Sequence, residues 1–182
     1  MSLRLKINLI VAALTVLFVA ALLALQIKSI RASVSEEVVA ANRVAAQLLN
    51  RSAWGYAARG TAAMQGYLQG VGRVRSNDIA LYDANGAELY VSPPSPYKAG
   101  RNAPDWFEAL IAPPPSVQAI QFPDGKLEVR SNASRAVLDA WEELVQLVLA
   151  SVALLVLVNG LVLWLVGRAV RPFGRIVTAL DE

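Results

Sequence analysis

The stretch INLIVAALTVLFVAALLALQI, residues 7–27, contains 21 residues and no charged side chain. At about 1.5 Å of rise per residue, a helix of this length spans roughly 30 Å, the thickness of the hydrocarbon core of a bilayer. A second uncharged stretch, LVQLVLASVALLVLVNGLVLWLVG, covers the 24 residues 144–167 and is long enough to cross with some tilt. The first stretch is longer than the apolar core of a signal peptide and continues into helix-favouring sequence, so we expect a retained anchor. The sequence therefore predicts two transmembrane helices.

The composition agrees with a chain that lies partly in lipid. Of its 182 residues, 55% are hydrophobic, and the mean hydropathy is +0.44. The chain has no cysteine and no histidine, which excludes disulfides, iron–sulfur clusters and thiolate zinc sites. It also lacks the most common ligand of transition metals and haem and the usual general base. We therefore expect no metal site, no cofactor and no catalytic residue in these residues.

The excess of basic charge lies beside the two apolar stretches. The pI is about 9.4, but residues 28–143 hold 12 basic and 12 acidic side chains and are neutral. This distribution is not that of a nucleic-acid-binding surface, so we expect no nucleic-acid partner. The flanking basic residues are Arg4, Lys6, Arg168, Arg171 and Arg175.

These flanking charges predict the orientation of the chain in the membrane. Basic residues beside short loops favour the cytoplasmic side, which places residues 1–6 and 168–182 in the cytoplasm. Residues 28–143 then lie on the other side. We expect a protein of the bacterial inner membrane with a central domain in the periplasm.

Residues 29–50 contain no Gly or Pro and predict a helix that continues out of the first span. Its apolar side chains recur at the spacing of a short coiled coil. The predicted seam consists of Val34, Val38, Ala41, Ala45 and Leu48. We interpret this stripe as the contact between two copies in a homodimer. The alternative is a helix that packs on its own domain.

The centre of the chain predicts a small α+β domain. Residues 78–83 and 87–91 are β-prone and are separated by Ala84-Asn85-Gly86, where Asn and Gly both tolerate φ > 0. A second hairpin joins residues 117–122 to 126–130 through Pro123-Asp124-Gly125, where Gly can take the left-handed conformation. Helices are predicted over 61–74, over 104–111, and from an N-cap at Asn132 or Ser134 into the second span.

Two groups of residues are candidates for binding a ligand or a partner. Trp106 and Phe107 are adjacent on a short helix, so one of them can face away from the core, and the alternative is that both straddle its edge. Tyr97 and Arg101 lie on a polar loop that is either solvated or binds an anion. Glu142-Glu143 has no nucleophile or base nearby and is interpreted as a solvated helix face.

The residues after the second span carry a helical stripe. Pro172 follows Arg171, and Phe173, Ile176, Val177 and Leu180 then occupy one face of a predicted helix. This arrangement resembles the first helix of a HAMP linker, the helical relay below the second span of bacterial receptors.

Four further features extend the resemblance to the whole chain: the start MSLRLKINL, the motif Pro104-Asp105-Trp106-Phe107, the hairpin before Asn132, and Asp139-Ala140-Trp141. Together they resemble the LapD/MoxY type of N-terminal sensor region, as in MoxY-like (NarL-family) sensor histidine kinases. The resemblance implies a PAS-like periplasmic domain between two spans that tends to dimerise.

The resulting expectation is the input part of a two-component sensor histidine kinase. The 182 residues themselves have no enzyme activity in this interpretation. ATP would bind a kinase domain beyond Glu182, which would pass a phosphoryl group to a response regulator. An unknown periplasmic ligand or protein would supply the signal. The residues expected to transmit it are Trp141, Pro172, Phe173, Ile176 and Leu180. The alternatives are a receptor with a cyclic-di-GMP output domain and a membrane-anchored adaptor without output.

Overall fold

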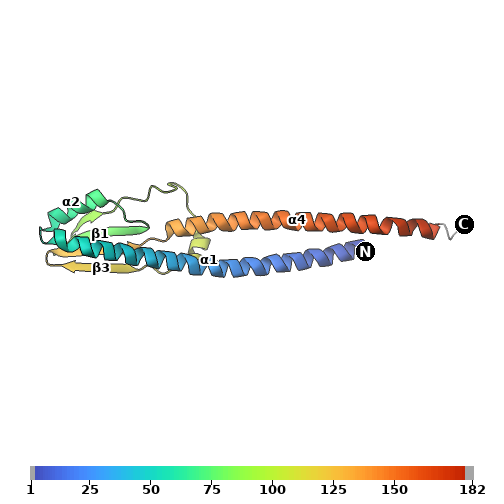
Figure 1. Ribbon diagram of the computed structural model, residues 1–182, viewed down its shortest axis with the longest axis horizontal. Helices are drawn as coiled ribbons and strands as arrows, with labels where there is room; N and C mark the ends of the chain where they lie inside the picture. Colours follow the sequence, from blue (N-terminus) through green and yellow to red (C-terminus); the bar gives the residue numbers. More distant parts are fainter. Residues whose placement is uncertain (1–2, 179–182) are drawn as a thin grey trace. The chain divides into compact units, whose positions relative to one another are not determined.

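The computed structural model describes residues 3–178, and the side chains of residues 5–56 and 58–168 among them (Figure 1). The described residues form four helices and one four-stranded antiparallel sheet, which confirms the α+β class. The helices are α1 (Leu3–Ala57), α2 (Thr61–Val71), α3 (Asp105–Ile111) and α4 (Ser134–Thr178). The strands are β1 (Asn77–Asp83), β2 (Glu88–Val91), β3 (Val117–Phe122) and β4 (Gly125–Ser131).

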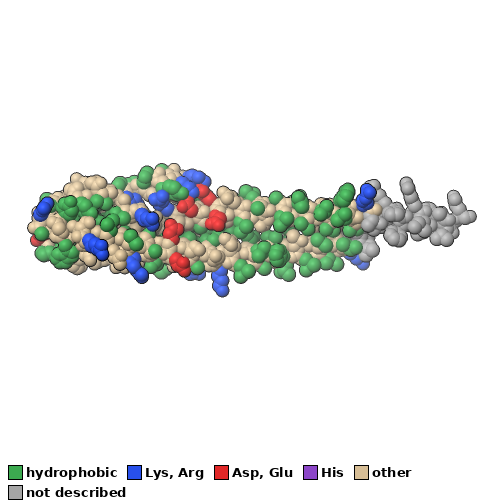
Figure 2. All heavy atoms as spheres, viewed as in Figure 1, with side chains coloured by type: hydrophobic (Ala, Val, Ile, Leu, Met, Phe, Trp, Pro, Cys, Tyr) green, Lys and Arg blue, Asp and Glu red, His purple; other side chains and the backbone are tan. Residues whose placement is uncertain are grey.

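The chain divides into two units. One contains the residues up to Ile27 together with those from Glu143 onward, and the other is Lys28–Glu142. The first unit holds the apolar parts of α1 and α4, and both helices are long and apolar enough to cross a membrane. Hydrophobic side chains dominate the visible surface of these helices (Figure 2).

Polar side chains within the apolar helices bind the backbone of their own helix. Thr15 Oγ1 donates to Val11 O at 2.8 Å, and Asn159 Nδ2 donates to Leu155 O at the same distance. Bonds to the carbonyl one turn earlier satisfy such donors without water. These bonds therefore lower the cost of placing the two donor groups in an apolar environment.

The sheet of the second unit has the order β2-β1-β4-β3. The two predicted hairpins are confirmed, since β1 pairs with β2 and β3 pairs with β4. The hairpins join through β1 and β4, whose register runs from Asn77 opposite Ser131 to Asp83 opposite Gly125. This pairing of distant segments places β1 and β4 at the centre.

The first hairpin turn differs from the predicted one. Gly86 has φ +84°, as expected, but Asn85 does not have a positive φ. The Gly86 N–H donates to Asp83 O, and Asp83 Oδ1 accepts from the N–H groups of Asn85 and Ala87. The loop is therefore a turn followed by one left-handed residue, and only the glycine requires that conformation.

Gly125 serves a purpose other than the predicted one. It lies in β4 and does not have a positive φ. A Cβ at this position would overlap the carbonyl oxygen of Tyr82 on the neighbouring strand. Glycine is needed here because two backbones approach closely, not because the turn requires a left-handed residue.

One face of the sheet packs against α1 and α2. Alternate residues of the central strands are fully buried on this face, including Ile79 and Leu81 of β1 and Leu127 and Val129 of β4. The helices contribute Ala45, Leu49, Ala53, Met64 and Leu68 to the same core. This alternation is that of an antiparallel sheet with one buried face.

The predicted dimer seam lies largely in the interior of a single chain. Val34, Val38, Ala41 and Ala45 are all buried, whereas Leu48 is 52% exposed and Leu49 only 1%. A straight helix drifts about 20° per heptad from a 3.5-residue repeat, so the buried stripe moves from Leu48 to Leu49. Within a single chain this stripe is covered, as in the alternative of a helix packed on its own domain, and a contact between two copies stays a prediction.

A pair of buried amides connects α1 to the sheet. Asn42 and Asn77 have at most 1% of their surface exposed. Asn42 Nδ2 donates to Asn77 Oδ1 at 3.0 Å and to Val129 O at 3.2 Å. Asn77 Nδ2 donates to Ala41 O at 3.3 Å and to Val74 O at 3.1 Å. Since buried amides are costly without partners, this network defines how α1 sits on the sheet.

Four of the residues expected to transmit a signal lie outside the described residues or side chains. They are Pro172, Phe173, Ile176 and Leu180. The backbone of α4 continues to Thr178, so the first three of these belong to that helix.

Candidate functional site

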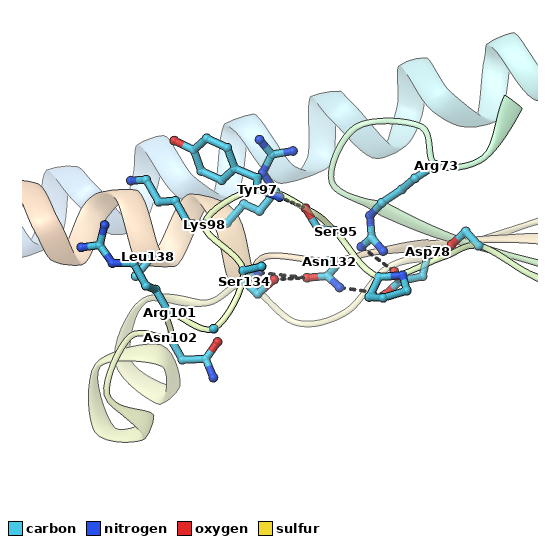
Figure 3. Close-up of a pocket in the computed structure, with 15 residues that line it drawn as sticks. Arg73, Asp78, Ser95, Tyr97, Lys98, Arg101, Asn102, Asn132, Ser134 and Leu138 are labelled. Carbon is cyan, nitrogen blue, oxygen red and sulfur yellow. Dashed lines mark hydrogen bonds and ion pairs between the residues drawn. The ribbon is translucent and has the colours of Figure 1, made fainter.

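A pocket of about 450 Å³ lies within the unit Lys28–Glu142 (Figure 3). Three segments line it. They are the start of β1 with Arg73 before it and Asp78 within it, the loop between β2 and α3, and the first turns of α4 with Asn132 just before them. Tyr97 and Arg101, both predicted as binding candidates, are among the lining residues. Cavities of this size are typical of small-molecule sites.

Arg73 lines the pocket with a side chain that is only 11% exposed. Its guanidinium pairs with Asp78 at 2.5 Å and donates to Pro93 O at 2.9 Å. Its Nε–H has no hydrogen-bond partner among the described residues. A buried donor without a partner is costly, so this N–H lowers the stability of the present arrangement of Arg73.

The loop between β2 and α3 is tied to the start of α4 by ion pairs. Lys98 Nζ lies 2.6 Å from both Asp139 Oδ1 and Glu142 Oε2, and Arg101 lies 2.7 Å from Glu142 Oε1. The hydrogen bonds that the Lys98 ammonium donates, first to Asp139 and then to Glu142, raise its pKa above its usual value. Glu142 was expected on a solvated face, but it forms ion pairs with two cationic side chains of the loop.

The loop turns tightly where these cations lie. Lys98 has φ +48° and Gly100 φ +80°, and the Arg101 N–H donates to Lys98 O at 3.1 Å. A lysine in the left-handed backbone conformation is uncommon, costs free energy and persists only where surrounding contacts hold it. The ion pairs to α4 supply that restraint.

Tyr97 and Arg135 form a second connection between this loop and α4. The Arg135 guanidinium lies 4.0 Å from the centre of the Tyr97 ring. The Tyr97 hydroxyl donates to Asp139 Oδ1 at 3.1 Å. No ion pair of Arg135 with a carboxylate is found among the described residues. Arg135 therefore lines the pocket with a charge that a ligand can pair with.

Asn132 and Ser134 confirm the predicted start of α4 and also lie at the pocket. Asn132 Oδ1 accepts from Ser134 N at 3.1 Å and from Ser134 Oγ at 2.6 Å. Asn132 Nδ2 donates to Asp78 Oδ2 at 2.9 Å, on the carboxylate that also holds Arg73. One network of polar groups thus connects β1, the approach to it and the first turn of α4.

The two adjacent aromatic residues of α3 point in different directions. Phe107 is fully buried, whereas Trp106 is 60% exposed. The Trp141 ring of α4 lies 5.6 Å from the Trp106 ring and 5.2 Å from the Phe107 ring, centre to centre. These three rings connect α3 to α4, and Trp106 and Phe107 do not line the pocket. The predicted candidates therefore separate into a pocket group and an aromatic group.

The opposite face of the sheet carries a short row of charges on β4. Glu128 Oε1 lies 2.8 Å from Lys126 Nζ, and Glu128 Oε2 lies 2.7 Å from Arg130. These two partners, Lys126 first, lower the pKa of the Glu128 carboxyl below its usual value. The Arg130 guanidinium also donates to the Tyr82 hydroxyl at 3.2 Å. The side chains of this row therefore pair mainly with one another.

The arrangement is suited to binding. Within the described part of the chain, no three His, Cys, Asp or Glu side chains gather as metal ligands would. The pocket combines cations with hydroxyl and amide groups, which recognise anions and polar ligands. Sequence reasoning did not find Arg73 and Arg135, because they lie far from the loop along the chain. The only local signal was the basic character of residues 97–101.

Comparison with known proteins found no relative of this chain. No protein-family model, curated protein or solved structure matches the chain. Its function is therefore inferred from the pocket, the polar ties to α4 and the two apolar helices.

Proposed function

We propose that the chain is the sensing and membrane-spanning part of a bacterial receptor, a two-component sensor histidine kinase. The observation that carries this proposal is α4. Its first turns, with Ser134, Arg135 and Leu138, line the pocket, and the same helix contains the apolar stretch 144–167 and continues to Thr178. A ligand that alters the pocket therefore acts on a helix able to cross a membrane.

In this proposal, ion pairs transmit the signal from the loop to α4. Lys98 and Arg101 hold Asp139 and Glu142, which lie one turn apart on the helix. A ligand that binds better to one arrangement of loop and helix shifts the population toward it. The aromatic contact of Trp141 with Trp106 and Phe107 provides a second restraint on the same part of α4.

The remaining parts of the proposal follow from the flanking sequence. The basic residues beside the apolar stretches favour cytoplasmic termini, an inner-membrane location and a periplasmic domain. The resemblance of residues 171–180 to a HAMP helix supports a homodimer that passes the signal to an ATP-binding kinase domain and then to a response regulator. The resemblance to LapD/MoxY regions supports the PAS-like description of the domain.

A fusion to a known output domain tests the proposal. Residues 1–182 are joined, with several linker phases, to the catalytic half of a histidine kinase, and autophosphorylation is measured in membranes. We expect Lys98→Ala to change the output at least about threefold in one phase, because it releases α4 from the loop. The matched control is Lys126→Ala, which removes a cation that pairs within β4.

Three results would contradict parts of the proposal. Equal output from both variants in every linker phase rejects signal transmission and favours a membrane-anchored adaptor. Reporters fused after Glu182 that behave as periplasmic reject the orientation. A chain that continues beyond Glu182 into a cyclic-di-GMP domain replaces the kinase output and leaves the sensing role intact.

A further inference from the structure

We propose that the pocket binds a small organic anion that carries carboxylate groups. This inference rests on the proposed function, because it names the ligand class of the same pocket. The first observation is charge. The pocket is lined by four cationic side chains, Arg73, Lys98, Arg101 and Arg135, and by one carboxylate, Asp78. Asp139 and Glu142 of α4 pair with Lys98 and Arg101, so the whole group carries one net positive charge. Anions are therefore favoured over cations or neutral ligands.

The existing ion pairs show which cations a ligand can engage. Arg135 has no carboxylate partner among the described residues, and its guanidinium is held in place over the Tyr97 ring. Arg101 is 61% exposed, and its contact with Glu142 lacks the alignment of a hydrogen bond, since Glu142 Oε1 accepts none within the described residues. A guanidinium presents paired donors that match a carboxylate. These two arginines are the proposed anchors.

Arg73 supplies an independent reason for a ligand. Its Nε–H is buried and has no acceptor among the described residues, while its other donors bind Asp78 and Pro93 O. Most buried donors in proteins have a partner. Because this N–H is buried as the structure stands, a ligand oxygen satisfies it only if the Arg73 side chain shifts toward the pocket.

The size and the remaining walls favour an organic molecule over an inorganic ion. A volume of about 450 Å³ exceeds what a single phosphate or acetate fills. Pro94, Leu138 and the Tyr97 ring offer apolar surface for carbon atoms. Ser95 and Asn102 offer further polar groups for a second carboxylate or a hydroxyl. A di- or tricarboxylate or an aromatic acid fits these walls.

Binding to the full chain in nanodiscs tests the inference directly. Succinate, citrate and benzoate are titrated against the chain by calorimetry and by thermal unfolding, with succinamide, benzamide and inorganic phosphate as comparison ligands. We expect at least one carboxylate to bind saturably and to raise Tm by about 5 °C or more at high excess. The neutral amides should give no shift.

Two arginine variants locate the binding. Arg135→Gln should weaken carboxylate binding at least about tenfold, because a charge-assisted pair is lost. Arg51→Gln is the matched control, since Arg51 is an exposed residue of α1 that does not line the pocket, and it should bind as the original chain does. Equal affinity in both variants would overturn the assignment.

The remaining outcomes also decide the matter. Binding of the amides as strongly as the acids, binding of phosphate alone, or no saturable binding of any of the three acids would each refute the carboxylate class. Failure here is distinct from failure of the receptor proposal. Carboxylate binding with no response of the kinase fusion keeps the pocket and rejects signalling. If the output of the fusion responds to Lys98→Ala but no carboxylate binds, the signalling proposal stands and the carboxylate assignment is rejected.

Discussion

Replacement of Asn77 by alanine should destabilise the unit Lys28–Glu142 more than any exposed substitution in it. The Asn77 side chain is fully buried, accepts one hydrogen bond from Asn42 and donates two, to Ala41 O and Val74 O. A hydrogen bond contributes about 1 kcal/mol net, and a partner left buried and unsatisfied costs more. Three lost bonds predict a decrease of about 2–4 kcal/mol in the free energy of unfolding.

The assay is chemical unfolding of the full chain in detergent, followed by tryptophan fluorescence and near-UV circular dichroism. Asn50→Ala is the matched control, because Asn50 is an exposed amide on α1, the helix that carries Asn42, and it should change stability by less than about 0.5 kcal/mol. A double-mutant cycle of Asn42→Ala with Asn77→Ala should show a coupling of about 1 kcal/mol. Equal stability of Asn77→Ala and Asn50→Ala would refute the reasoning that this amide pair holds α1 on the sheet.

Three further predictions concern the same unit. Gly125→Ala should destabilise it by at least about 2 kcal/mol, because the new Cβ overlaps the Tyr82 carbonyl, and an unchanged Tm would show that the strands are farther apart. The ion pairs lower the pKa of Glu128 below 4.5 in the folded state. Its contribution to the free energy of unfolding, less than about 1 kcal/mol, is therefore present above pH 4.5 and lost as the pH falls below that value. The free energy of unfolding of Glu128→Gln should therefore fall less between neutral and acid pH than that of the original chain. The same pH dependence in both proteins would contradict the pairing. Single cysteines at Leu48 and Leu49 should react with a maleimide at rates that differ at least about tenfold in favour of Leu48, and similar rates would contradict the orientation of α1.

The predicted seam shows which features of α1 a periodic sequence pattern can predict. The apolar stripe of residues 34–45 predicted the buried face correctly, because its spacing depends only on helix geometry. It could not show whether that face meets a second copy or the chain's own sheet, since both bury the same side chains. The polar residue on that face, Asn42, pairs with Asn77, which lies 35 positions away. Only the folded chain reveals that partner.

The candidate site also contains residues that the sequence predicted and residues that only the structure shows. Tyr97 and Arg101 were found because a cluster of polar and basic residues on one loop is visible locally. Arg73 and Arg135 join them only because β1 pairs with β4, which brings the residues before β1 and after β4 to the same end of the sheet. The role of Glu142 changed for this reason too, since Lys98 reaches it from 44 positions away.

The sequence by itself determined the two apolar helices, the two hairpins and the start of α4. These features depend on neighbours along the chain, through the rise of a helix, the chemistry of a turn and the capping of a first turn. Tertiary structure decided the strand order, the side of α1 that is covered and the grouping of cations around one pocket. Such pairings join segments that are distant in sequence, and their free energy comes from burial and hydrogen bonds that exist only after those segments meet.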